Sequence, residues 1–209
     1  EQAHLDEAVA ALKHQRCGAL AAVEHALTRS RYRTLKTAVE TWLEQPRYTS
    51  IATLPLFSLL PDLLSPLLSS LLLHPGWLVE AADTSEEANE TLHDLRKACK
   101  HARYQAEFFA PFYNADFQTW TNEVKDIQAT LGSVHDRQVL TDLLIEHQPK
   151  RGKLASLHTL IEQSNAADMA DWDDRRQKYL SAEFRQSLRR LILDAVRSPG
   201  VPTPTNAMN

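Results

Sequence analysis

The chain has 209 residues and a mass of 23.6 kDa, with 23 Lys and Arg against 27 Asp and Glu, for a formal net charge of −4 and a pI near 6.1. This length fits one domain or two small ones. A composition of 43% hydrophobic and 24% charged residues is typical of a soluble globular protein and excludes general disorder or a collagen-like chain. The net charge does not favour a basic nucleic-acid-binding protein, although it says nothing of the local charge of single helices.

Apolar residues recur at intervals of three and four, and little material is left for strands, so we predict an all-α fold. Helices are expected at residues 3–29, 31–45, 51–73 in short pieces, 86–113, 115–131, 134–147, 153–164 and 167–197. Gly132 is expected to end one helix, and Ser133 with Asp136 to cap the next. Residues 198–209 have no apolar period and are expected to form a flexible tail.

The most apolar segment, residues 51–73, is long enough to span a membrane. It contains Asp62 and three prolines, Pro55, Pro61 and Pro66. Because a carboxylate is costly inside a membrane and each proline interrupts a helix, we expect a broken helix in a protein core.

The two cysteines, Cys17 and Cys99, have no ligand spacing around them and predict neither a disulfide framework nor a zinc site. A reducing cytoplasm is the simplest location. Glu1 is not an initiator Met and no charged and apolar leader follows it, so we expect no secretory signal and a chain trimmed from a longer one.

Residues 92–109 form an amphipathic helix when they are placed on a wheel at about 100° per residue. One side is apolar and consists of Leu92, Leu95, Ala98, Cys99, Ala102, Ala106 and Phe109. The opposite side carries His93, Arg96, Lys97, Lys100, Arg103 and Tyr104. No Asp or Glu lies between Leu95 and Ala106 to relieve the repulsion between these cations. Such a helix has two interpretations: it is a basic face exposed to solvent, or it lies where an external polyanion supplies the negative charge.

Two further arginines fall on apolar helical seams. Arg16 lies in the seam of Leu5, Val9, Leu12, Leu20, Val23 and Leu27, and Arg176 lies in the seam of Met169, Trp172, Leu180, Phe184 and Leu191. An unpaired buried charge costs several kcal/mol, so each arginine needs a partner. One alternative is an internal carboxylate such as Asp136 or Glu183; the other is a cleft into which several helices point cations.

Two segments resemble the CHAD family, the conserved histidine α-helical domain. The first is the His-x-x-Arg-Lys-x-x-Lys-x-x-Arg-Tyr pattern of residues 93–104, and the second is the Gln-x-x-Leu-Gly-x-x-x-Asp pattern of residues 128–136. Residues 27–43, with Tyr32, Leu35, Trp42 and Leu43, are similar to a mid-domain helix of the family. The resemblance implies a helical bundle of two similar halves about a pseudo-two-fold axis, with basic side chains around a central cleft that binds inorganic polyphosphate.

We expect a CHAD-like domain over residues 1–197, with residues 81–197 as the better-matching second half; the family's front basic motif is not found. The resemblance implies that His93, Arg96, Lys97, Lys100, Arg103 and Tyr104 face polyphosphate, with Lys125 and Arg16 as further candidates. Arg176 joins this set from its place on the wheel alone. We expect binding without catalysis, no cofactor or metal, and free polyphosphate or polyphosphate granules as partners; a membrane is not expected, and nucleic acid is disfavoured as a partner.

Two alternatives remain open. A metal-dependent phosphohydrolase of the HD type is prompted by His93-Asp94 and His135-Asp136, but adjacent side chains on a helix diverge by about 100° and no further converging ligands are found. We expect His135 to be an exposed residue in a capped first turn. A helical RNA-binding or scaffold module is the other alternative. Single-strand readers usually offer aromatic residues for base stacking, whereas most aromatics here are expected to face core seams: Trp42, Trp120, Trp172, Phe109 and Phe184.

Overall fold

The computed structural model describes residues 2–147 and 155–195, and every regular element within these ranges is a helix. The all-α prediction is therefore confirmed. The chain divides into two compact units, of which the first comprises Glu1–Thr53 with Arg137–Glu162 and the second Leu54–Asp136 with Gln163–Asn209. The expected tail at residues 198–209 lies outside the described residues.

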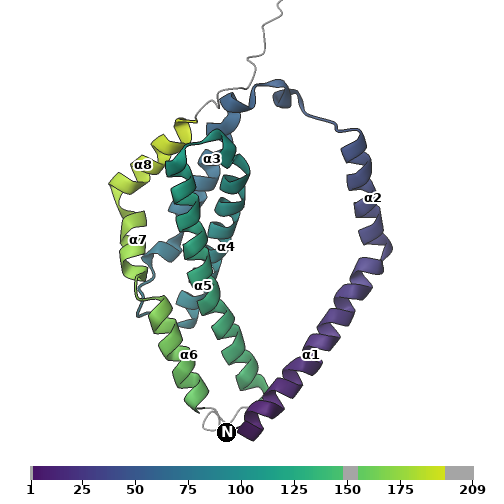
Figure 1. Cartoon of the computed structure of the whole chain (residues 1–209), viewed down its shortest axis with the longest axis vertical. Helices are drawn as coiled ribbons and strands as arrows, with labels where there is room; N and C mark the ends of the chain where they lie inside the picture. Colours follow the sequence, from purple (N-terminus) through teal and green to yellow (C-terminus); the bar gives the residue numbers. More distant parts are fainter. Residues whose placement is uncertain (1, 148–154, 196–209) are drawn as a thin grey trace, which may run out of the picture. The chain divides into compact units, whose positions relative to one another are not determined.

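The first unit contains the helices α1 (Gln2–Thr28) and α2 (Ser30–Glu44) and a short 3-10 helix (Ser50–Thr53), which are seen in purple to blue in Figure 1. The bounds of α1 and α2 lie within one residue of those predicted. This unit also takes in the end of α5 and the start of α6 (Ala155–Asp168). There Leu144 is buried against Leu140 and Leu157.

Most of the described residues in the apolar seam of α1 are exposed, with Leu12 half-buried, and the residues of α2 are exposed throughout. Leu20, Val23 and Leu27 are 52%, 55% and 49% exposed, and α2 buries no residue. Arg16 is exposed as well, so it needs no buried partner. The prediction that this seam and Trp42 face a core is thus wrong here, because the spacing of apolar residues fixes the helix but does not supply a covering surface.

The second unit is a bundle built around one apolar core. Its helices are α3 (Leu56–Leu72), α4 (Glu86–Phe109), the first part of α5 (Ala115–His147), α7 (Trp172–Leu180) and α8 (Ala182–Leu193) (Figure 1). Two 3-10 helices, Pro75–Leu78 and Ala110–Phe112, connect them. Helix α3 packs against α4 and α8, and α7 packs against α8 and the Pro75–Leu78 turn.

The segment 51–73, predicted as a helix in short pieces, is interrupted once, between the 3-10 helix Ser50–Thr53 and α3; α3 itself continues through Pro61 and Pro66, where a break was also expected. One face enters the core through Leu60, Leu64, Leu68, Leu71 and Leu72, as expected of a core helix, while Leu63 on another face is 50% exposed. By length and composition alone, Leu56–Leu78 would be long and apolar enough to cross a membrane, with a mean hydropathy of 1.7.

Trp77 holds α7 against the rest of the bundle. Its fully buried ring stacks on Trp172 at a centroid distance of 5.7 Å and on Tyr179 at 4.2 Å. Trp77 Nε1 donates a hydrogen bond to the Leu71 carbonyl, and Trp172 Nε1 donates one to the Val79 carbonyl. Both indole donors are thus satisfied inside the core.

The predicted helix over residues 167–197 is instead two helices that meet at Ser181. Ser181 Oγ accepts a hydrogen bond from the Phe184 amide, which is the side-chain cap that begins α8. Met169 belongs to a turn before α7. The predicted end of this helix at residue 197 lies outside the described residues.

Helix α4 has the register that the wheel predicted. Ser85 Oγ accepts a hydrogen bond from the Ala88 amide, and Glu86 and Glu87 occupy the first turn, where carboxylates favour the helix dipole. The apolar side lies in the core: Leu92, Leu95, Cys99, Ala102, Ala106 and Phe109 are buried, and Ala98 is partly buried. Burial raises the pKa of the Cys99 thiol to about 12, while Cys17 on α1 is exposed.

Candidate functional site

The basic residues of α4 lie opposite its buried side, and we call them the α4 row: His93, Arg96, Lys97, Lys100, Arg103 and Tyr104. Lys97, Lys100 and Tyr104 are exposed, while His93, Arg96 and Arg103 are half-buried. Among the described residues, neither Arg96 nor Lys100 forms an ion pair. The row is therefore only partly neutralised by the protein itself.

One face of α5 meets the α4 row at Gly132. Lys125, Gln128, Gly132 and His135 recur at intervals of three and four, so they share a face of α5. Arg96 Nε lies 3.2 Å from the position that a Cβ on Gly132 would occupy. The guanidinium thus rests on the helix backbone at a site where any other residue would crowd it.

Helix α5 runs from Ala115 through Gly132 to His147 without interruption, so the predicted helix end at Gly132 is wrong. The predicted capping box at Ser133 and Asp136 does not form, because both residues lie inside the helix. The glycine serves the close approach of Arg96 and not a turn. A helix interior ordinarily disfavours glycine by about 1 kcal/mol relative to alanine, so this contact has a cost in local stability.

His93 of α4 and His135 of α5 stack their rings at a centroid distance of 3.8 Å with an interplanar angle of 29°. The expectation that His135 is exposed in a first turn is wrong, since it is half-buried in mid-helix. Burial lowers the pKa of His93, and His135, Lys97 and Arg96 lower it further, while Asp94 acts in the opposite direction. His93 is therefore predominantly neutral at pH 7.

Two cations of the row have internal partners. Lys97 Nζ lies 2.6 Å from Asp94 Oδ1, and both side chains are about half exposed. Arg103 Nε lies 3.7 Å from Glu107 Oε1, and its guanidinium lies over the Tyr104 ring at 4.5 Å from the centroid. Surface pairs of this kind are weak and allow a stronger anion to compete.

Several buried polar atoms at the junction of α4 and α5 have no hydrogen-bond partner in the described structure. They are His93 Nδ1, Arg96 Nε, Arg103 Nε and Gln128 Oε1. A buried donor without a partner costs about 1–3 kcal/mol, and more when it is charged. Three of these four atoms belong to the α4 row, while Trp120 Nε1, Arg175 Nη1 and Tyr179 OH also lack a partner elsewhere in the described structure.

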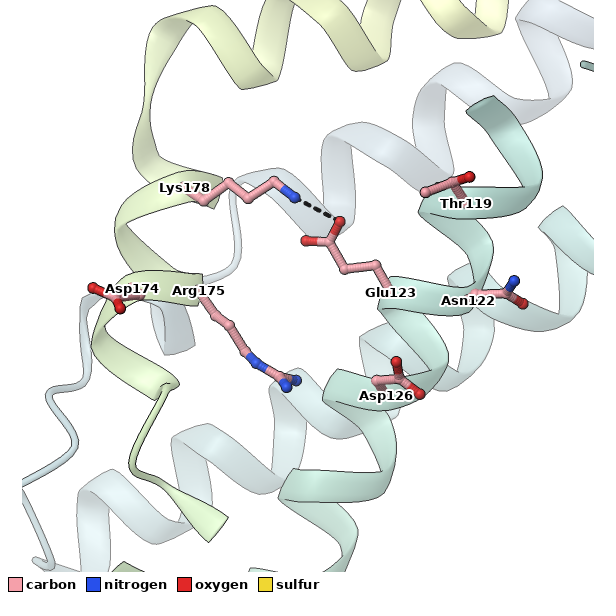
Figure 2. Close-up of a pocket in the computed structure, with 7 residues that line it drawn as sticks. All are labelled: Thr119, Asn122, Glu123, Asp126, Asp174, Arg175 and Lys178. Carbon is pink, nitrogen blue, oxygen red and sulfur yellow. Dashed lines mark hydrogen bonds and ion pairs between the residues drawn. The ribbon is translucent and has the colours of Figure 1, made fainter. Parts of the chain in front are cut away.

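A pocket of about 520 Å³ lies elsewhere in the same unit, between α5 and α7 (Figure 2). Lys178 and Arg175 reach from α7 toward α5, and Lys178 Nζ lies 2.7 Å from Glu123 Oε2. The lining residues are Thr119, Asn122, Glu123, Asp126, Asp174, Arg175 and Lys178. With three carboxylates and two cations, this pocket does not favour a polyanion.

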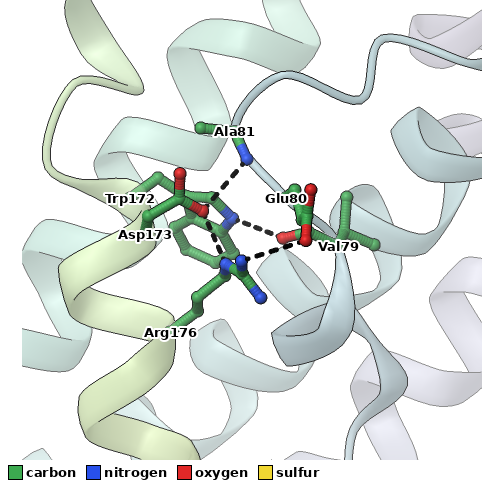
Figure 3. A network of polar contacts seen from close by, with 6 residues as sticks. All are labelled: Val79, Glu80, Ala81, Trp172, Asp173 and Arg176. Atoms are coloured by element: carbon green, nitrogen blue, oxygen red, sulfur yellow. Dashed lines mark hydrogen bonds and ion pairs between the residues drawn. The ribbon is translucent and has the colours of Figure 1, made fainter.

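Arg176 is neutralised on α7. Its Nε lies 2.6 Å from Asp173 Oδ1 and its Nη2 lies 3.5 Å from Glu80 Oε1, and the same Asp173 oxygen accepts a hydrogen bond from the Ala81 amide (Figure 3). Hydrogen bonds from Arg176 and from the Ala81 amide lower the pKa of Asp173. Of the two alternatives for Arg176, an internal carboxylate partner is observed, although the partners are neither Asp136 nor Glu183.

The structure thus brings His93, Arg96, Lys97, Lys100, Arg103 and Tyr104 onto one surface, with exposed Lys125 on the facing side of α5. It does not join Arg176 to them, and Arg16 belongs to the first unit. Sequence reasoning missed His135 and the role of Gly132. The spacing of Gln128, Gly132 and His135 along one helix face was the signal that would have found both.

No group of three or more His, Cys, Asp or Glu side chains placed to hold a metal ion occurs in residues 2–147 and 155–195. The two His-Asp dipeptides, at residues 93–94 and 135–136, do bring two imidazole rings together. These rings, however, are stacked face to face. Stacked rings direct their nitrogen lone pairs outward from the ring edges, which is not the convergence that a shared metal needs.

A protein-family model matches the part of the chain that carries this surface. The family model of the CHAD domain matches residues 1–145, which include α1, α2, α3, α4 and nearly all of α5. No curated protein and no solved structure matches the chain. Because the match covers more than half of the chain and includes the whole α4 row with its facing surface on α5, the chain belongs to the CHAD family.

Proposed function

We propose that this chain binds inorganic polyphosphate, without catalysis, on the α4 row and the facing residues of α5. Membership of the CHAD family is consistent with this ligand, because the resemblance to that family implies polyphosphate binding. In the same proposal the row forms one wall of a basic cleft between two similar halves of the domain. The expected setting is the cytoplasm, with free polyphosphate or granules as the partner.

The observation that carries the proposal is the state of Arg96 and its neighbours. Arg96 Nε is buried, lacks a hydrogen-bond partner among the described residues and has no carboxylate paired with it. Lys100, one turn further, is also unpaired there. A phosphate oxygen placed between the two side chains would offset their mutual repulsion and accept charge-assisted hydrogen bonds from them.

The row suits a linear ligand because its members advance along one helix. From His93 to Arg103 the rise is roughly 15 Å, at 1.5 Å per residue, so successive phosphates meet successive side chains. Arginine offers a planar fork to phosphate oxygens and lysine a mobile point charge. Each engaged phosphate also releases condensed counterions, as in nucleic-acid binding.

The first test is a salt series with the purified 209-residue chain and long-chain polyphosphate, with Kd measured by calorimetry. If four or five phosphates are engaged, Kd should rise roughly 100-fold between 50 and 200 mM salt. A Kd that does not change with salt concentration would contradict phosphate binding by the α4 row.

The second test reverses the two unpaired charges in the Arg96→Glu, Lys100→Glu variant. Loss of two charge-assisted hydrogen bonds and added repulsion should weaken binding at least about 100-fold. The matched control is Arg189→Glu, Arg190→Glu, which makes the same change in net charge at exposed positions of α8 and should keep the wild-type Kd within about threefold at equal salt. Equal losses in both variants, or none, would sink the proposal.

Competition with single-stranded RNA of matched charge separates the remaining binding alternative. Tyr104 is 51% exposed and is the aromatic residue of the row, which leaves little surface for base stacking. Polyphosphate should therefore displace RNA at a lower concentration than the reverse. Preferential retention of RNA would favour an RNA-binding module, and release of orthophosphate during the titration would favour the enzyme.

A further inference from the structure

The His93–His135 stack joins the two helices that carry the proposed ligand surface. Its rings lie 3.8 Å apart between centroids, and His93 Nδ1 is buried with no hydrogen-bond partner among the described residues. A neutral imidazole with an unused ring nitrogen keeps the capacity to take a proton or to hydrogen-bond a ligand. In the free protein the stack therefore has one ring nitrogen, His93 Nδ1, whose hydrogen-bonding capacity is not used.

The charges that act on His93 come from both helices. Helix α4 contributes Arg96, Lys97 and Asp94, and α5 contributes His135. Asp94 is the carboxylate of this set, and its oxygen is already 2.6 Å from Lys97 Nζ. The carboxylate next to His135 in sequence, Asp136, is exposed. Of the side chains that act on His93, Arg96, Lys97 and His135 oppose an additional positive charge, and Asp94 favours it.

We infer that His135 is a further binding residue for polyphosphate and that the His93–His135 stack takes up a proton when the polyanion binds. This inference rests on the proposed function. A bound phosphate chain would supply the negative charge that the free stack lacks, and the imidazolium would donate a charge-assisted hydrogen bond in return. The binding of polyphosphate and the binding of the proton then increase each other's affinity by the same factor.

The sign of the effect follows from the free protein. Because burial and positive neighbours lower the pKa of His93, its ring is predominantly neutral near pH 7, and a nearby polyanion raises that pKa. Proton uptake on binding is greatest between the two values, so affinity rises as pH falls. Two imidazolium rings 3.8 Å apart would repel strongly, which limits the uptake to about one proton per stack.

The experiment measures proton uptake directly. Titration calorimetry at pH 6.5 in two buffers of different ionisation enthalpy gives the number of protons taken up per bound chain. Long-chain polyphosphate is the probe, because only its terminal groups titrate near neutral pH. We expect roughly half a proton or more for the wild type and a Kd about three- to tenfold lower at pH 6.0 than at pH 7.5.

The variants His93→Gln and His135→Gln remove the titratable rings and keep polar side chains of similar size. Each should lose most of the proton uptake and of the pH dependence. The matched control is His101→Gln, an exposed imidazole on the same helix about 100° around from the centre of the row, which should behave as the wild type. Full proton uptake in His135→Gln would overturn the assignment of His135.

NMR titration of the histidine side chains in the unmutated chain, with and without ligand, keeps the inference testable if a variant fails to fold. The titration midpoint of the His93 ring should move to higher pH when polyphosphate is present, because the polyanion favours the imidazolium form. Tight binding with an unmoved midpoint would overturn the inference and leave the proposed function standing. Absence of binding at any pH would overturn both, and is recognised by the lack of any heat or chemical shift change.

Discussion

Helices α4 and α7 both carry clustered cations, yet their electrostatic states differ. On α7, Arg176 contacts Asp173 and Glu80, and Lys178 contacts Glu123 at 2.7 Å, whereas Arg175 Nη1 has no hydrogen-bond partner within the described structure. On α4, Arg96 and Lys100 have no ion pair within the described structure. Cations that form ion pairs within the protein contribute to its fold. Cations without an ion-pair partner raise the local electrostatic potential and are available to an anionic ligand.

The contrast also has a structural cause. The α7 cations face acidic residues of the segment before α4 and of α5, which come from distant parts of the sequence. The α4 row instead faces the side of α5 that carries Lys125, Gln128, Gly132 and His135. The exposed Asp136 there is a carboxylate, but it forms no ion pair with Arg96 or Lys100 within the described structure. Which helix binds an anion therefore depends on the facing helix as much as on the basic one.

The largest effect is expected from the core that holds α7. Trp77→Ala removes a fully buried ring stacked between Trp172 and Tyr179, and should lower the free energy of unfolding by about 3–5 kcal/mol in urea denaturation. Trp42→Ala, the same change at a 46% exposed ring, should cost less than about 1 kcal/mol. Equal losses would show that the two regions are not as distinct as described.

The next effect contrasts an unpaired with a paired lysine on the same helix. Lys100→Ala should weaken polyphosphate binding about five- to tenfold, because a full charge is lost from the row. Lys97→Ala should weaken it about twofold, because Lys97 already contacts Asp94 at 2.6 Å. A Kd series at low salt checks this order, and the reverse order would contradict the distinction between free and paired cations.

Gly132→Ala tests the close approach of Arg96. A methyl group at this position would stand 3.2 Å from Arg96 Nε, so the guanidinium must shift and binding should weaken about three- to fivefold. The free energy of unfolding should hardly change, because the gain in helix propensity offsets the displaced side chain. Gly18→Ala on α1, where no atom lies within 4 Å, should stabilise its helix and leave Kd unchanged. Unaltered binding by Gly132→Ala would refute the positioning role.

The smallest effect comes from removing the internal anions. Glu107→Gln and Asp94→Asn each free a cation of the row, Arg103 or Lys97, and should tighten binding about twofold at low salt. Asp173→Asn removes the closer of the two carboxylates that pair with Arg176 on α7 and leaves Glu80 at 3.5 Å. If α7 lies outside the binding surface, Kd should stay the same; a comparable gain there would bring Arg176 into the site.

Local sequence patterns predicted the helices well where the pattern itself decides the structure. The wheel of α4 separated buried Leu95 and Cys99 from the basic row because period and burial agree. The apolar seam of α1 has an equally regular period, which predicts burial, yet Leu20 and Val23 are exposed. Periodicity describes one surface, and burial requires a second surface that the pattern does not contain.

The candidate site was predicted on α4 and only partly on α5. The basic row follows from residues within one helix, so the sequence contains it. The contacts of Gly132 with Arg96 and of His135 with His93 join positions about 40 residues apart, and no local rule relates them. Glycine was interpreted as a helix end because that is its commonest local role, and a tertiary contact overrode it.

The burial of Cys99 has a practical consequence for every measurement above. A thiol with a pKa of about 12 and no exposed surface does not react with maleimides at neutral pH, whereas Cys17 on α1 is exposed. The unmutated chain should therefore accept a single fluorophore at one known position. That position lies outside the α4 row, so a dye reports on the chain while the ligand surface keeps its native residues.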